Sequence, residues 1–266
     1  MKRKFLLEAS EDSGISNEEN TVSISVETAN DYMSLIERIS RKIALGVVLC
    51  ILSPVCLIFL GGLSEYGGTK ASEDLLGGIG VTALLLIIAV AVGVFIIYGM
   101  QLEKYNYIDK KQLILQYGVR GIVEKKKESY EMKFRKNITI GVILCIISVI
   151  PIIVAGSMGM GDFICVICVD VLLAIVAAAV YLFIVSGMIY SSYDKLLQEG
   201  EYTVHKKNVN KKTEQWAGAY WCLATAIYLA VSFLTEEWKL TWIIWAVAGV
   251  LFGAIACIVN AATKDK

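Results

Sequence analysis

Six long apolar runs constrain this chain more than any other feature of its sequence. They cover residues 43–60, 77–100, 138–158, 163–190, 216–234 and 241–259. A helix rises about 1.5 Å per residue, so about 20 residues cross a hydrocarbon core of roughly 30 Å. The composition agrees, because 56% of the residues are hydrophobic and the mean hydropathy is +0.63. The sequence therefore predicts an all-α fold, a bundle of six transmembrane helices.

A short motif recurs where three of these runs begin. It reads GVVLCILS at 46–53, GVILCIIS at 141–148 and, more weakly, GAYWCLAT at 218–225. A second match pairs Phe95 and Gly99 with Phe183 and Gly187. Units of two spans keep their orientation on duplication, which favours parallel repeats. We therefore predict three repeated helical hairpins, of which the third is supported by one span only.

The basic residues are distributed unevenly between the loops. The N-terminus, the two long loops and the C-terminus hold 23 of the 25 Lys and Arg residues, and the short loops hold only Lys70 and Lys239. The positive-inside rule then places both termini in the cytoplasm. We expect a multi-pass protein of the cell membrane. A cleaved signal peptide is not expected, because only residues 5–7 form an apolar stretch near the start.

The charge and polarity of the first residues predict a boundary near residue 28. Residues 1–27 read as a disordered cytoplasmic N-terminus, and residues 28–262 as a six-span membrane domain. Thr28 and Asp31 are spaced as a helix cap, so we expect a helix that begins there and runs into the first span. Pro54 lies inside that span and predicts a kink.

One acidic residue lies well inside an apolar run, and this makes Asp170 a candidate intramembrane polar site. A carboxylate at mid-membrane costs about 2.5–3.5 kcal/mol. Asp170 should therefore face the bundle or an aqueous cavity, or be protonated. The alternative interpretation is a tolerated polar residue that is hydrogen-bonded to a neighbour.

All seven cysteines fall inside the predicted spans, so no extracellular disulfide framework is expected. Cys165 and Cys168 form a candidate redox pair near the start of the fourth span, where a helix N-terminus favours a thiolate. His205 is the only histidine, which argues against the common histidine-based zinc sites. No metal, cofactor or nucleotide-binding motif is expected, and we predict no enzymatic activity.

Basic residues precede the third span. Lys125, Lys126, Lys127, Arg135 and Lys136 are candidate contacts for lipid headgroups, each worth about 1 kcal/mol near an anionic surface. The alternative is a topology signal on a solvated face. Nucleic-acid binding is not expected, because no recognisable binding fold accompanies this charge.

Three other patterns concern packing. The tryptophans, at positions 216, 221, 238, 242 and 245, lie toward the ends of the last two spans and read as interfacial anchors. Gly249 and Gly253 form a GxxxG motif that favours helix packing, within the chain or in a homo-oligomer. Residues 113–115 are a short apolar patch that packs under the bundle or forms a brief strand.

Several strings resemble a known module. They are RKIALGVVLCILSP at 41–54, GIVEKKK at 121–127, KLLQEG at 195–200 and TWIIW at 241–245. Together they resemble the membrane module carried at the C-terminus of some bacterial helix-turn-helix transcriptional regulators, over about residues 27–262. The resemblance implies no catalytic or ligand-binding residues. Residues 1–40 are too few for a helix-turn-helix domain, so direct DNA binding is not expected.

Three functional hypotheses follow. The first is a non-enzymatic membrane module for sensing, anchoring or partner binding toward the cytoplasm, in contact with the bilayer and with a cytoplasmic protein. The second is a small transporter, suggested by the repeats and by Asp170. The third and most remote is a membrane thiol oxidoreductase that uses Cys165 and Cys168.

Overall fold

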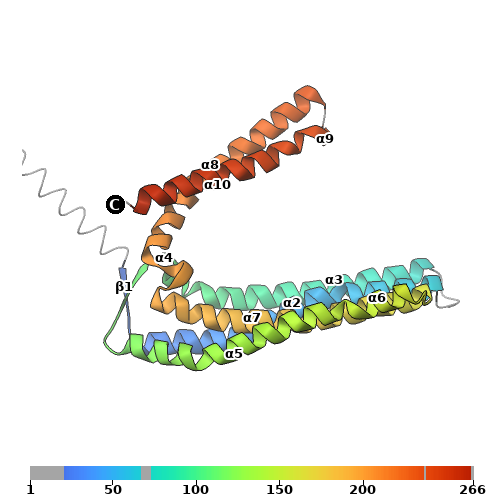
Figure 1. Ribbon diagram of the computed structural model, residues 1–266, viewed down its shortest axis with the longest axis horizontal. Coiled ribbons are helices and arrows are strands. Elements are labelled where there is room, and N and C mark those ends of the chain that lie inside the picture. Colours follow the sequence, from blue (N-terminus) through green and yellow to red (C-terminus); the bar gives the residue numbers. More distant parts are fainter. Residues whose placement is uncertain (1–20, 67–72, 237, 265–266) are drawn as a thin grey trace, which may run out of the picture. The chain divides into compact units, whose positions relative to one another are not determined.

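The computed structural model describes residues 21–66, 73–236 and 238–264 and is almost entirely helical (Figure 1). Within these residues the chain divides into two compact units. Unit 1 comprises residues 21–108 and 113–197, and unit 2 comprises residues 109–112 and 198–264. The membrane domain expected over residues 28–262 stays a prediction, and the two units are described separately.

Long helices lie side by side in unit 1 (Figure 1). In chain order its elements are β1 (Thr21–Ile24), α2 (Val26–Tyr66), α3 (Glu73–Glu103), α4 (Asn106–Lys110), β2 (Gln112–Leu115), α5 (Val119–Ser148), α6 (Ile150–Ser157) and α7 (Asp162–Leu197). Helix α2 packs against both α3 and α7, while α5 and α6 pack against α7. The long helices therefore lie in the order α3, α2, α7, α5.

Among the described residues, five helical segments are long and apolar enough to cross a membrane. They are Val26–Tyr66, Asp74–Glu103, Val119–Ser157, Asp162–Tyr202 and Thr213–Thr235, and a sixth apolar helix, Ile243–Ile258, is shorter. Only 11 to 17% of the residues in their most apolar windows are buried, so these helices present apolar side chains outward. Such a surface suits lipid rather than water. The first five predicted spans are confirmed by length and composition.

The start of α2 differs from the sequence prediction. The cap is Ser25, whose Oγ accepts a hydrogen bond from the Thr28 backbone N–H at 3.2 Å. The sequence predicts disorder through residue 27, but Thr21–Ile24 form β1 and α2 begins at Val26. Residues 1–20 lie outside the described residues. As predicted, the helix then continues without interruption into the first span.

Both prolines are accommodated beside a buried serine. Helix α2 runs through Pro54, which cannot donate to the Cys50 carbonyl, and the Ser53 hydroxyl donates to that carbonyl at 2.9 Å instead. Pro151 lies just after the break between α5 and α6. There the hydroxyl of Ser148 donates to the Cys145 carbonyl at 2.7 Å. The kink expected at Pro54 stays a prediction.

A glycine faces a phenylalanine ring in two of the helix pairs of unit 1, α2–α3 and α5–α7. A methyl group on Gly46 of α2 would lie 2.7 Å from the ring of Phe95 on α3. A methyl group on Gly141 of α5 would overlap the ring of Phe183 on α7. These glycines let the helices approach closely, which is how apolar helices gain dispersion contacts in lipid.

Unit 2 contains a second kind of helix pair. Its elements are η1 (Gly200–Tyr202), α8 (Val204–Thr235), α9 (Trp238–Thr241) and α10 (Ile243–Lys264). Aromatic rings connect α8 and α10: Trp221 stacks on Trp245 with 6.0 Å between ring centroids, and Phe252 lies 5.1 to 5.5 Å from Trp216, Tyr220 and Trp221. Trp221 and Trp245 therefore pack within the pair rather than acting only as interfacial anchors.

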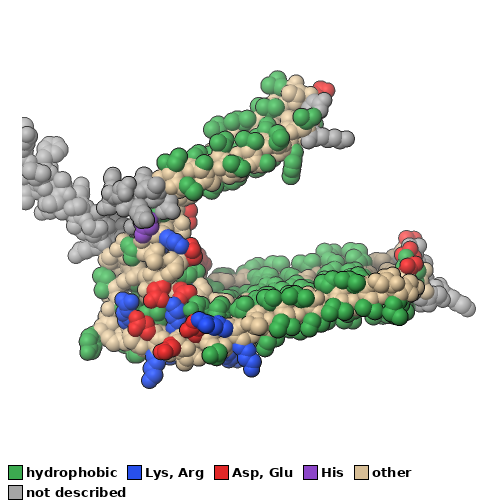
Figure 2. Space-filling model, viewed as in Figure 1, with side chains coloured by type: hydrophobic (Ala, Val, Ile, Leu, Met, Phe, Trp, Pro, Cys, Tyr) green, Lys and Arg blue, Asp and Glu red, His purple; other side chains and the backbone are tan. Residues whose placement is uncertain are grey.

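Hydrophobic side chains cover most of the length of unit 1 and a small acidic group lies at one end, while acidic and basic side chains gather together at the other end (Figure 2). We call this part the charged end; it comprises residues 21–42, 102–108, 113–136 and 191–197. The separation is that of a membrane-embedded body with a water-exposed end.

Candidate functional site

The charged end of unit 1 has a hydrophobic core of its own. It consists of Ile24, Ala29, Tyr32, Met33, Ile36, Ile108, Leu113, Val119, Val123, Ile189, Tyr193, Leu196 and Leu197. These residues come from β1, α2, α4, β2, α5 and α7, so segments far apart in sequence pack together in this core. Tyr107 packs at the edge, where burial raises the pKa of its phenol above the ordinary value of 10.0. A core of this kind is typical of a folded domain.

A two-stranded sheet in this domain has one face toward the core and exposed side chains on the other. β1 pairs with β2, and Ile24 and Leu113 point into the core. Because strand side chains alternate, Ile114 points outward and is 58% exposed. Tyr117 follows β2 and is fully exposed, and Gly118 then adopts φ 83° to start α5. Ile114 and Tyr117 form what we call the apolar patch.

Polar contacts join α5 to its neighbours at the charged end. The Lys127 Nζ lies 2.6 Å from the Asp194 carboxylate of α7, and these side chains are only 20% and 23% exposed. Lys126 Nζ donates to Asn30 Oδ1 of α2 at 2.9 Å. Partial burial strengthens the Lys127–Asp194 pair relative to pairs on an open surface, whereas the Lys126 contact is exposed. The domain is therefore held by charge as well as by its core.

These contacts separate the five candidate headgroup ligands into two groups. Lys125, Lys126 and Lys127 precede residue 138, where the predicted span begins, by about 17 to 20 Å along the helix. The headgroup layer is only about 5 to 8 Å thick on each side. Arg135 and Lys136 lie within about 5 Å of that boundary. The lipid prediction stays a prediction for all five residues; Arg135 and Lys136 lie closest to the predicted boundary, whereas Lys126 and Lys127 also contact protein side chains.

Asp170 lies on the face of α7 that packs against α2. One turn before it, Val166 contacts Gly62 of α2, and one turn after it, Ala174 lines a groove beside Leu52. Both carboxylate oxygens are buried, and neither has a hydrogen-bond partner among the described residues. The tolerated-residue interpretation expected a hydrogen-bonding neighbour, and the described part of the chain contains none.

The cysteine pair lies in the first turns of α7. All seven cysteines are free, and Cys165 and Cys168 are partly buried. The Cys165 Sγ is 3.9 Å from the Met160 carbonyl oxygen. A redox role for this pair stays a prediction.

No metal site is evident in the part of the chain that the structure describes, because no three His, Cys, Asp or Glu side chains there are grouped to hold an ion. Comparison with protein-family models, with curated proteins and with solved structures found no match. The resemblance to the regulator membrane module therefore stays a prediction that no relative tests.

The brief strand predicted for residues 113–115 is confirmed as part of β2, but the exposure of Ile114 and Tyr117 and the Lys127–Asp194 pair were not predicted from the sequence. Residues 113–115 form a continuous apolar run that is followed by Tyr117-Gly118, and this is a local signal for a short strand and a turn. The ion pair joins residues 67 positions apart and has no local signal. Only a knowledge of how α5 and α7 pack could reveal it.

Proposed function

We propose that this protein is a non-enzymatic integral membrane protein whose charged end binds a cytoplasmic protein. The observation that carries the proposal is the apolar patch of Ile114 and Tyr117 on a folded domain outside the apolar spans. An exposed aromatic beside an open strand is a common element of protein-binding surfaces. Ile122, on the first turns of α5, is a further exposed apolar side chain of this domain.

The proposal includes six membrane crossings, with the shorter helix Ile243–Ile258 as the last, and both termini in the cytoplasm. The distribution of Lys and Arg supports this orientation.

The proposal also includes three repeated hairpins. The Gly46–Phe95 and Gly141–Phe183 contacts support the first two repeats, because the same pairs match in the sequence. The resemblance to the bacterial regulator module supports a role in sensing or anchoring.

Photo-crosslinking tests the proposal. A photoreactive amino acid is introduced at Tyr117 and, in a matched variant, at Glu128, which is exposed in the same domain. We expect one crosslinked protein from position 117, at least five-fold more than from position 128. A substitution Ile114→Lys should reduce the crosslink at 117, whereas Glu128→Lys should not. Equal capture from both positions, or capture that Ile114→Lys leaves unchanged, would contradict the proposal.

Asp170 supports a second candidate function, a small transporter. A buried carboxyl group without a hydrogen-bond partner in the described residues can take up a proton or a cation, and such groups line transport paths. The test compares wild type with Asp170→Asn in vesicles that report flux of protons, sodium or potassium. Flux that Asp170→Asn abolishes supports transport. Flux that survives the substitution excludes a mechanism coupled to Asp170.

The remaining candidates have direct tests. Alkylation of intact cells with a membrane-impermeant maleimide should label Cys165 and Cys168 if the pair acts in thiol exchange; absence of labelling rejects that role.

A homo-oligomer would use Gly249 and Gly253, since a methyl group on either would meet no atom within 4 Å among the described residues. Gly253→Leu should then lower the oligomeric mass in mild detergent.

A further inference from the structure

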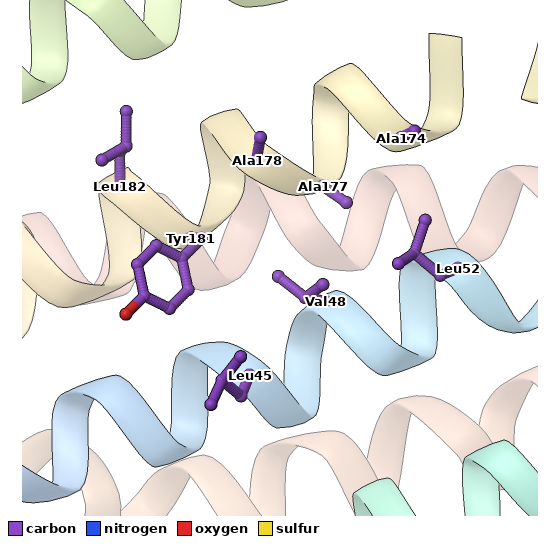
Figure 3. Close-up of a pocket in the computed structure, with 8 residues that line it drawn as sticks. All are labelled: Leu45, Val48, Leu52, Ala174, Ala177, Ala178, Tyr181 and Leu182. Carbon is purple, nitrogen blue, oxygen red and sulfur yellow. The ribbon is translucent and has the colours of Figure 1, made fainter. Parts of the chain in front are cut away.

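A groove runs between α2 and α7 in unit 1 (Figure 3). Its volume is about 460 Å³. Leu45, Val48 and Leu52 form one wall, and Ala174, Ala178 and Tyr181 lie along the other. The lining is almost entirely apolar. Tyr181 contributes a hydroxyl group, which points toward the end of the groove near Leu45 (Figure 3). The two alanines keep the groove open because their side chains are small.

Neither α3 nor α5 covers this groove. At 100° per residue, the three residues of the α2 wall lie about 100 to 160° around the helix from Gly46, which faces α3. On α7, Ala174, Ala178 and Tyr181 lie about 140 to 180° from Phe183, which faces α5. Within unit 1 the groove therefore opens away from both neighbouring helices.

A cationic side chain stands at one end of the groove. Arg41 is one helical turn before Leu45, and positions 41, 45, 48 and 52 share one face of α2. Its guanidinium lies 2.8 Å from the Glu37 carboxylate, but these side chains are 59% and 57% exposed. An exposed pair of this kind contributes little and exchanges readily for another anion. Residues 37–42 hold three basic side chains against one acidic one.

The dimensions fit one leaflet of a bilayer. Arg41 to Leu52 covers about 16 Å along α2, and half of the hydrocarbon core is about 15 Å. The guanidinium fork matches a phosphate, and Tyr side chains place their hydroxyl at the membrane interface. The cationic Arg41 end suits an anionic group, and the apolar groove beyond it suits a hydrocarbon chain. An amphipathic ligand carries both groups in one molecule.

We propose that the groove binds an anionic phospholipid, with an acyl chain along Leu45, Val48 and Ala178 and its phosphate on Arg41. The Tyr181 hydroxyl donates to the headgroup region. This site is separate from the apolar patch, so neither proposal depends on the other.

Mass spectrometry of intact protein tests the site. The protein is extracted in mild detergent from vesicles that contain equal amounts of phosphatidylcholine and phosphatidylglycerol, and its bound lipids are counted. We expect phosphatidylglycerol to exceed phosphatidylcholine several-fold on wild type. Ala178→Leu should reduce the bound lipid about five-fold or more by filling the groove. Arg41→Ala should remove the preference for phosphatidylglycerol while retaining some lipid.

Two matched variants serve as controls. Ala89→Leu adds the same volume at an exposed position of α3, and Lys125→Ala removes a charge far from the predicted boundary. Both should retain lipid as wild type does. If Ala178→Leu retains as much lipid as Ala89→Leu, the site is wrong. If Ala178→Leu instead lowers the oligomeric mass and leaves lipid unchanged, a second copy of the chain occupies the groove and the proposal fails.

A measurement on wild type alone does not depend on any variant folding. Phosphatidylglycerol with a photoreactive acyl chain is incorporated into the vesicles, and the labelled peptides are identified. We expect labelling to concentrate on residues 45–52 and 174–182. Equal labelling along the exposed faces of α3 and α5 would show only general lipid contact and would overturn the proposal.

Discussion

The helix pairs of the two units are held together by different chemistry. In unit 1, Gly46 and Gly141 each face a phenylalanine ring across a close helix contact. In unit 2, Gly218 occupies the matching sequence position, yet a methyl group there would meet no atom within 4 Å among the described residues. The α8–α10 pair is instead joined by the stacked rings of Trp221 and Trp245.

The difference shows that a shared sequence motif does not guarantee a shared contact. Close approach of glycine-containing helices gains dispersion energy from backbone atoms, whereas aromatic pairs gain it between rings held farther apart. Unit 2 also adds a hydrogen bond from the Tyr220 hydroxyl to the Ala248 carbonyl, at 2.5 Å. The same substitution should therefore have effects of different size at matching positions of the two units.

The largest effect is expected from Trp221→Ala. This side chain contacts Tyr220, Trp245 and Phe252, and its loss should destabilise the α8–α10 pair by about 3 kcal/mol. Limited proteolysis in mild detergent should show faster cleavage within residues 198–264. Trp242→Ala serves as the control, because Trp242 is largely exposed. Equal protection of both variants would show that the aromatic contacts are not what joins these helices.

Gly141→Leu should have the next largest effect. The new side chain would overlap the ring of Phe183, and overpacking costs about 1 to 3 kcal/mol. Gly218→Leu, at the matching position of unit 2, should leave the melting temperature almost unchanged. Thermal unfolding of both variants checks this. If Phe183→Ala failed to restore stability to Gly141→Leu, the steric explanation would be rejected.

Lys127→Ala should destabilise the charged end of unit 1 by about 1 kcal/mol, because it leaves the Asp194 carboxylate partly buried without its cation. The exchanged pair Lys127→Asp with Asp194→Lys should recover part of that loss. Hydrogen exchange of residues 119–130 measures the effect, which should shrink in high salt. A loss that is independent of salt and unaffected by the exchange would point to packing instead.

Ser232→Ala should have the smallest effect, about 0.6 kcal/mol. Its hydroxyl donates to Thr241 Oγ1 at 2.7 Å where α8 gives way to α9, and both side chains are buried. Thr225→Ala provides the comparison, since that hydroxyl bonds only within its own helix, to the Trp221 carbonyl. Proteolysis between residues 232 and 241 should increase for the first variant alone.

The spans could be predicted because the length of an apolar run is a local property. The same holds for the uninterrupted helix into the first span, since Tyr32, Ile36 and Ile39 repeat at helical spacing and are buried. The position of the cap was missed by three residues, because Ser25 and Thr28 are both acceptable caps. In these cases the sequence limits the start and end of a helix to a few neighbouring residues.

Contacts between distant segments could not be predicted. The core under the apolar patch joins Ile24 to Leu113 and Leu196, and nothing local relates these residues. The tryptophans illustrate the same limit: their positions near span ends fit anchors, but whether a ring faces lipid or a partner helix depends on the rotation of each helix. Asp170 could be found from the sequence because a single charge in an apolar run is conspicuous. That its carboxylate has no hydrogen-bond partner among the described residues could be seen only from the packing of the helices.

Helix α2 has one further consequence. It extends over 41 residues without a break, about 60 Å, from the strand at the charged end to the opposite end of unit 1. If it is straight through Pro54, a helix of this length acts as a lever: a tilt of about 5°, such as a change in bilayer thickness can cause, would move one end by about 5 Å relative to the other. A tilt of this helix would therefore displace β1, which adjoins it through Ser25.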